Sequence, residues 1–194
     1  MTYVNIILNK ERNKIIMSTV YYENINAKNF KLLLAYTKDN VLKLHFNTEP
    51  SSEKYFLNSL YHNFRDVKKS ELRNNFALTI EEYLNGKSKD LNLPVQLTGT
   101  EFNKRVWTEM MKIPYGELRS YRDVAKAVGS EKASRAVGNA NNRNNIVLIV
   151  PCHRVIGSNN NLVGFAPGLE YKVELLEMEG HKIIKKQNSF FVDR

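Results

Sequence analysis

Apolar residues in the first 50 positions come in short runs separated by polar residues. The four runs are TYVNIIL (2–8), KIIMSTVYYE (14–23), FKLLLAYT (30–37) and NVLKLHF (40–46). Runs of this length, rich in β-branched and aromatic residues, predict strands, and the turn-forming triplet Lys38–Asp39–Asn40 predicts a hairpin between the last two. We therefore expect an antiparallel sheet here.

A helical period follows. Apolar side chains recur three or four residues apart at Leu72, Phe76, Ile80, Tyr83 and Leu84. This spacing predicts a helix that flanks the sheet and ends at Asn85–Gly86. Residues 87–100 contain few large apolar side chains and carry Pro94 and Gly99, so we expect a linker.

Three further helices are predicted after this linker. The first has an apolar face and ends before Pro114; its core residues are Phe102, Val106, Trp107, Met110 and Ile113. The second starts at a capping box of Ser120 and Asp123 and ends at Gly129, and Ser130 begins the third, over 131–142. Two short helices joined in this way favour a helix-turn-helix, although most such helix pairs never touch DNA. The small side chains of the third helix fit either close approach to a groove or tight helix packing.

The apolar run IVLIV (146–150) predicts a short strand that Pro151 ends. Cys152 then lies at the carboxyl end of this strand. In an extended backbone Cys152 and His153 point to opposite faces, so proton transfer between them needs a turned backbone or a bridging water.

These elements predict an α/β (α+β) chain with an N-terminal antiparallel sheet and flanking helix, and a mostly helical C-terminal part. We expect domains at 1–95 and 96–185, and a C-terminal tail at 186–194. The C-terminal domain holds the helix-turn-helix and the short strand leading to Cys152.

Composition narrows the function classes. A single cysteine in 194 residues excludes an internal disulfide and any zinc site that needs two thiolates, and four scattered histidines give no ligand spacing, so we expect no metal. Without an apolar signal segment or a run of about 18 apolar residues, the chain is expected to be cytoplasmic, with no membrane partner. The net charge is +9, and residues 119–154 carry seven basic side chains against two acidic ones, which suits a polyanionic partner.

Cys152 has two interpretations. A free cysteine often fills a core as a small hydrophobe. Its neighbours His153 and Arg154 instead favour a thiolate, and therefore a nucleophile.

Four segments carry a resemblance to a known family. They are IPYGELRSYRDVAKAVG (113–129), SRAVGNANNRN (134–144), PCHRVIG (151–157) and LVGFAPGLEYKVELLEMEG (162–180). In this order they resemble the O6-alkylguanine-DNA alkyltransferases, repair proteins that move an alkyl group from guanine to a cysteine. The resemblance covers residues 100–180. It implies that residues 1–95 form the family's variable N-terminal domain, of the ribonuclease H-like kind.

The resemblance also implies roles for individual residues. Cys152 would accept the alkyl group irreversibly from O6-alkylguanine or O4-alkylthymine, His153 would remove its proton through a water, and Glu179 would orient His153. Tyr121 would hydrogen-bond the flipped base and help protonate it, and Asn144 would brace the turn at the cysteine. The DNA-binding residues would be Tyr121, Arg135, Ala136 and Arg143, with Arg135 filling the gap in the duplex. The base pocket would be lined by Asn141, Val155, Phe165 and Ala166.

The implied partner is double-stranded DNA carrying alkylated guanine. The implied protein is a monomer without a cofactor, associated with the nucleoid when bound to DNA. The chain departs from the family at Phe165 and Ala166, where tyrosine and serine are common, and Pro167 stiffens that loop.

Two other functions fit parts of this pattern. A non-catalytic alkyltransferase-like protein binds the lesion without transfer, but such proteins lack the cysteine that this chain has. A cysteine hydrolase with Cys, His and Glu needs an oxyanion hole and leaves the basic helix pair unexplained.

Overall fold

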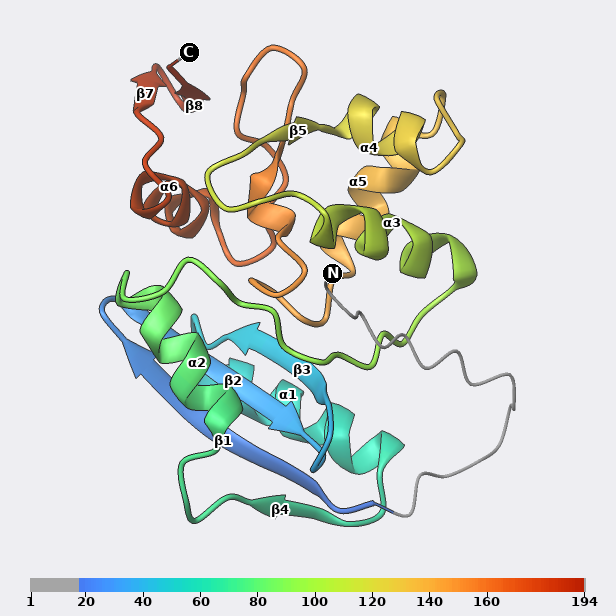
Figure 1. Ribbon diagram of the computed structural model, residues 1–194, viewed down its shortest axis with the longest axis vertical. Helices are drawn as coiled ribbons and strands as arrows, with labels where there is room; N and C mark the ends of the chain where they lie inside the picture. Colours follow the sequence, from blue (N-terminus) through green and yellow to red (C-terminus); the bar gives the residue numbers. More distant parts are fainter. Residues whose placement is uncertain (1–17, 194) are drawn as a thin grey trace. The chain divides into compact units, whose positions relative to one another are not determined.

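The computed structural model describes residues 18–193, which divide into two compact units (Figure 1). The first unit runs to Thr98 and also includes residues 145–147. The second comprises residues 99–144 and the chain from Leu148 onward. The expected α/β (α+β) class is confirmed.

The first unit is built on a four-stranded sheet of order β3-β2-β1-β4. Its strands are β1 (Val20–Ala27), β2 (Phe30–Tyr36), β3 (Val41–Phe46) and β4 (Val67–Lys69). β1, β2 and β3 pair antiparallel, and the turn at residues 38–40 joins β2 to β3 as predicted. The antiparallel sheet predicted for the first 50 residues is therefore confirmed over β1–β3, and β4, which lies beyond them, adds to β1 in parallel. The predicted strand at 2–8 lies outside the described residues.

Two helices cover the faces of this sheet, α1 (Pro50–Asn63) and α2 (Asn75–Leu84) (Figure 1). Phe56 and Leu60 of α1 pack on Leu33 of β2. Tyr36 lies three residues after Leu33 on β2, so its side chain is on the opposite face of the sheet. There its ring contacts Phe76 of α2.

Helix α2 was predicted, but α1 was not. Only Phe56 and Leu60 of α1 are buried, while Tyr55 and Tyr61 are exposed. The apolar stripe is therefore too narrow to stand out in the sequence.

The second unit contains the predicted helices, α3 (Glu101–Met111), α4 (Tyr121–Ala127) and α5 (Ser134–Asn142). Trp107 of α3 is buried and its indole N–H donates to the carbonyl of Ala140 at 2.8 Å, which confirms its core role. The capping box of Ser120 and Asp123 is present. The third helix starts at Ser134 rather than after Ser130, because residues 130–133 form a turn closed by the amide of Ala133.

Short elements complete this unit: β5 (Arg119–Ser120), the 3-10 helix η1 (Cys152–Arg154), β6 (Val155–Ile156), α6 (Leu169–Met178), β7 (Ile183–Lys186) and β8 (Ser189–Val192). β5 pairs parallel with β6, and β7 pairs antiparallel with β8. The prediction of a tail at 186–194 is wrong, because Ile183, Phe190 and Val192 pack in an apolar cluster with α6.

The prediction of a strand at 146–150 is also wrong. Ile146 makes one isolated bridge to Leu44 within the first unit, and Leu148 then takes a left-handed backbone with φ 69°. An apolar run cannot by itself distinguish a strand from a buried turn. Cys152 is therefore reached through a turn.

Candidate active site

The backbone at Cys152 is tightly turned. The amide of Cys152 donates to the carbonyl of Val150 at 2.8 Å, and the amide of Arg154 donates to that of Pro151 at 3.0 Å. With about three residues per turn in a 3-10 helix, neighbouring side chains diverge by about 120° rather than pointing to opposite faces. Cys152 and His153 are consequently both buried. The turned backbone is one of the two arrangements that the sequence required.

Asn144 braces this turn. Its Nδ2 donates to the carbonyl of Val150 at 2.9 Å and to Sγ of Cys152 at 3.2 Å. Burial raises the pKa of the Cys152 thiol, while the Asn144 hydrogen bond and the charge of Lys172 act in the opposite direction. The resting thiol is therefore protonated near neutral pH, and it needs a base to become a nucleophile.

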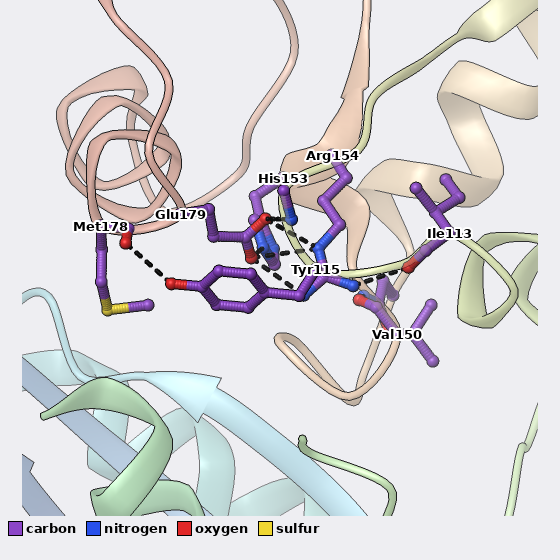
Figure 2. A network of polar contacts seen from close by, with 9 residues as sticks. Ile113, Tyr115, Val150, His153, Arg154, Met178 and Glu179 are labelled. Carbon is purple, nitrogen blue, oxygen red and sulfur yellow. Dashed lines mark hydrogen bonds and ion pairs between the residues drawn. The ribbon is translucent and has the colours of Figure 1, made fainter. Parts of the chain in front are cut away.

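His153 lies beside that thiol in sequence and is bonded to Glu179, the residue that ends α6. His153 Nε2 and Glu179 Oε1 are 2.9 Å apart, and both side chains are fully buried (Figure 2). Burial lowers the pKa of His153, and the hydrogen bond and charge of Glu179 oppose this. Nδ1 of His153 is buried and makes no hydrogen bond within residues 18–193. A neutral imidazole with one nitrogen held by a carboxylate and the other unbonded is suited to accept a proton.

Glu179 has a second partner that the sequence did not predict. Arg154 donates from Nε to both carboxylate oxygens at 3.0 Å and from Nη2 to Oε1 at 2.9 Å, and its Nη1 donates to the carbonyl of Ile113 at 2.7 Å. The amide of Gly116 also donates to Oε2. Figure 2 shows the carboxylate of Glu179 between His153 and Arg154, with Tyr115 alongside.

This network determines the charge state of Glu179. Burial alone would raise the pKa of Glu179, but the hydrogen bonds from His153 and Arg154 and the positive charge of Arg154 outweigh it and hold the pKa well below its ordinary value. Arg154 and Glu179 thus form a buried ion pair. Arg154 was one of the seven basic side chains counted in residues 119–154, but it is buried and does not contribute to the exposed basic surface.

Tyr121, the first residue of α4, faces the loop between β6 and α6. Its hydroxyl donates to the carbonyl of Val163 at 3.1 Å, and Asn141 Nδ2 of α5 donates to the carbonyl of Gly164 at 3.3 Å. Burial, followed by the charge of Cys152, raises the pKa of Tyr121, so its hydroxyl stays protonated as a donor. A Cβ at Gly164 would come within 3.2 Å of that hydroxyl, and Gly164 has φ +60°, so both the contact and the backbone favour glycine here.

Lys172 was missed by the sequence reasoning. It is fully buried on α6, and its Nζ donates to the carbonyls of Val155 at 2.7 Å and Val163 at 3.0 Å. Burial lowers the pKa of Lys172 to about 8, and the charge of Cys152 opposes this. Its position three residues after Leu169 and four before Leu176 puts a lysine on the apolar face of the helix, a signal that could have revealed it.

The structure gathers some predicted residues and leaves others apart. Asn144 is hydrogen-bonded to Cys152, and Glu179 is hydrogen-bonded to His153, the next residue in the chain. Tyr121 and Asn141 both bond to the loop after β6. Of the remaining candidates, Val155 and Phe165 are buried, Ala136 is half-buried, and Arg135, Arg143 and Ala166 are exposed. Within residues 18–193 no three His, Cys, Asp or Glu side chains come together as a metal site. In the same range no helix is long and apolar enough to cross a membrane.

Comparison with known proteins places this geometry in a family. Residues 101–181 match the family described as 6-O-methylguanine DNA methyltransferase, DNA binding domain. A methylated-DNA–protein-cysteine methyltransferase of Methanosarcina mazei is 39% identical over 167 residues, which span 84% of this chain and 99% of that protein. The chain belongs to the methylated-DNA–protein-cysteine methyltransferase family.

Other methylated-DNA–protein-cysteine methyltransferases agree with this assignment. The Methanosarcina acetivorans protein is 49% identical over 114 residues, covering 59% of this chain and 73% of its own length. Among solved structures, Mycobacterium tuberculosis OGT in complex with DNA superposes with a TM-score of 0.70 and 33% identity, over 82% of this chain and 92% of that one.

Proposed function

We propose that this protein repairs DNA by moving the alkyl group of O6-alkylguanine onto Sγ of Cys152, once per molecule. The observation that carries the proposal is the buried thiol beside a His153–Glu179 pair, in the unit that also holds α4 and α5. The non-catalytic alternative is not favoured, because the chain has the acceptor cysteine and its family is named for the transfer.

The reaction is a displacement at the alkyl carbon. The S–C bond forms as the C–O6 bond breaks, and guanine leaves with the electron pair of that bond. The thiol proton passes through a water to Nδ1 of His153, and the departing guanine takes a proton for which the Tyr121 hydroxyl is the donor. The proton on His153 then returns through water to the Tyr121 phenolate, so the thiol proton ends, in net balance, on the repaired guanine, which stays in the DNA strand. A thioether is not hydrolysed as a thioester is, so the cysteine is not regenerated.

Charge balance in the buried site favours this route. Arg154 and Glu179 compensate each other at rest, while Cys152 and His153 are neutral. Moving the proton from Cys152 to His153 creates an anion and a cation together, so the net charge of the site stays unchanged. Glu179 supports the imidazolium, and Lys172 and Asn144 support the thiolate.

The DNA contact is assigned to α4 and α5. Arg135 and Arg143 of this region are exposed, and the small Ala136 lets the helix approach a groove closely. A base inside a duplex cannot reach a buried thiol, so the alkylated guanine must leave the stack, and Arg135 would occupy its place. The pocket for that base would involve Asn141, Val155, Phe165 and Ala166, where backbone N–H groups of the loop can bind O6. We propose that a monomer acts on the DNA in the cytoplasm, bound at the nucleoid.

The test is a mass measurement. After incubation with duplex DNA containing O6-methylguanine, intact-mass analysis is expected to show a single methyl group per protein, stable on standing, and peptide analysis is expected to locate it on Cys152. Unmodified duplex DNA is the control. Binding of methylated DNA without any mass change would support the non-catalytic reading, and repeated release of product would support a hydrolase.

Arg135→Ala is expected to separate base extrusion from chemistry. Repair of methylated duplex DNA should slow by about tenfold or more, while the reaction with free O6-benzylguanine, which needs no extrusion, should stay within about twofold. Lys132→Ala, which removes a nearby exposed charge, serves as the matched variant for non-specific electrostatics. Equal losses on both substrates would contradict the assigned role of Arg135. The measurements are single-turnover rates at fixed salt.

A further inference from the structure

The β7–β8 hairpin packs on α6 and is hydrogen-bonded to the loop that follows β6. β7 and β8 pair over four residues each, from Ile183 opposite Val192 to Lys186 opposite Ser189. The hairpin follows α6 directly (Figure 1). Its side chains Ile183, Phe190 and Val192 pack with Leu176 of α6 and Leu162 of the loop that follows β6.

The edge of β8 that faces away from β7 is hydrogen-bonded to that same loop. The amide of Leu162 donates to the carbonyl of Phe190 at 2.8 Å, and the amide of Val192 donates to the carbonyl of Asn160 at 3.0 Å. Between them Asn161 and Phe191 form an antiparallel bridge. Residues 160–162 thus act as a short third strand on the hairpin.

The residues that follow this bridge are those that hold the site together. The carbonyl of Val163 accepts from both Tyr121 of α4 and Lys172 of α6. The carbonyl of Gly164 accepts from Asn141 of α5. The loop is therefore fixed by the hairpin at Asn160–Leu162 and by three helices immediately afterwards.

We propose that the β7–β8 hairpin is a positioning element of the alkyl-transfer site: by pairing with residues 160–162 it fixes the direction of the Val163 and Gly164 carbonyls, and so the places of the Tyr121 hydroxyl and the base-binding loop. This inference rests on the proposed function for its meaning in catalysis.

The physical reason lies in the loop's composition. Residues 157–164 include two glycines and three asparagines, and Asn160 has φ 63°, so the segment has little intrinsic preference for one backbone. Two backbone hydrogen bonds to β8 and the burial of Leu162 select one conformation before substrate arrives. Preorganisation of this kind strengthens binding of the base without changing the thiol itself.

A pair of substitutions at Val192 tests the role of the bridge. Val192→Pro removes the N–H that donates to Asn160 while keeping a side chain of three carbons, and the φ of proline is compatible with a strand. Val192→Ala keeps that N–H and loses more apolar packing. If packing alone mattered, the alanine variant would be the more affected of the two.

Three quantities are measured on the full chain: the half-saturating concentration of O6-benzylguanine, the limiting rate of benzyl transfer, and the rate of Cys152 alkylation by iodoacetamide, which needs no base binding. We expect Val192→Pro to raise the half-saturating concentration about fivefold relative to Val192→Ala and to lower the limiting rate of benzyl transfer, because the Tyr121 hydroxyl is less well placed. The rate of alkylation by iodoacetamide should stay within about twofold. Equal half-saturating concentrations in the two variants, or a loss in the rate of alkylation by iodoacetamide as large as the loss in benzyl transfer, would overturn the proposal.

Hydrogen exchange provides a readout that does not depend on activity. Amides of the peptide 157–168 are expected to exchange faster in Val192→Pro than in Val192→Ala, with α3 unchanged in both. Unchanged exchange in this peptide would overturn the positioning role. If the wild-type chain forms no benzyl adduct, the proposed function fails, and exchange still reports whether the hairpin orders the loop.

Discussion

The Cys152→Ala protein is expected to acquire no alkyl group from methylated DNA or from O6-benzylguanine. The sulfur is the only atom of this side chain that can form the new bond, and it is the only cysteine sulfur in the chain. Affinity for methylated duplex DNA should stay within a few-fold, because a buried thiol makes no phosphate contact. Intact-mass analysis and a DNA-binding titration on the same preparation check both parts.

Cys152→Ser is the matched variant for Cys152→Ala. A hydroxyl can still accept the hydrogen bond from Asn144 Nδ2, but it ionises far less readily than a thiol, so His153 cannot activate it to a useful extent. We expect this variant to be inert as well. An adduct on the alanine protein would show that another residue is the acceptor.

Glu179→Gln is expected to lower stability as well as reactivity. At neutral pH the charge of Glu179 compensates the buried Arg154, and removing one partner of a buried ion pair costs about 3 kcal/mol. In a chain of this size that corresponds to a fall in melting temperature on the order of 10 °C. Glu177→Gln, an exposed carboxylate in the same helix, is the control and should change the melting temperature little.

The stability difference depends on pH in a defined direction. Because the pKa of Glu179 is depressed in the folded protein, its contribution is complete above its ordinary value of 4.5 and is lost as the pH falls below it. The wild-type protein and Glu179→Gln should therefore differ most near neutral pH and converge on acidification. Thermal melts between pH 7 and the acid end check this, and equal melting temperatures at pH 7 would contradict a stabilising pair.

The same substitution should lower the rate of benzyl transfer and move its acid limb. Glu179 opposes the burial that lowers the pKa of His153, so without its charge the thiolate–imidazolium state loses support. In the wild type, we expect the rate of benzyl transfer to fall on the acid side with an apparent pKa that belongs to the Cys152–His153 pair. In Glu179→Gln the pKa of His153 falls, so at a temperature where both proteins are folded this acid limb should lie at lower pH. The rate above it should be lower than in the wild type, because less of the thiolate–imidazolium state forms. Superimposable profiles would mean that Cys152 is activated without Glu179.

The sequence by itself determined the elements whose signals are local. Helices α2, α3 and α4, the hairpin of β2 and β3, and the capping box at Ser120 follow from apolar spacing and turn chemistry within a few residues. The motif around Cys152 likewise indicated the family and the acceptor residue. Each of these features depends on residues that are close together in the sequence, so the sequence alone is enough to predict it.

Only the tertiary structure decided the contacts between distant segments. The strand expected at 146–150 became a turn because Ile146 bridges to β3 and Leu148 reverses the chain, and an apolar run fits either outcome. From the sequence, Arg154 would be expected to be a surface charge. In the structure it is buried and paired with Glu179, 25 residues later in the chain. From the sequence, Lys172 would be expected to be a solvated side chain of α6. In the structure its ammonium is buried and donates to the carbonyls of Val155 in β6 and Val163 in the following loop. Burial of a charge is decided by which partners the fold brings to it, and the neighbours along the chain do not identify those partners, even where helical spacing puts a lysine on an apolar face.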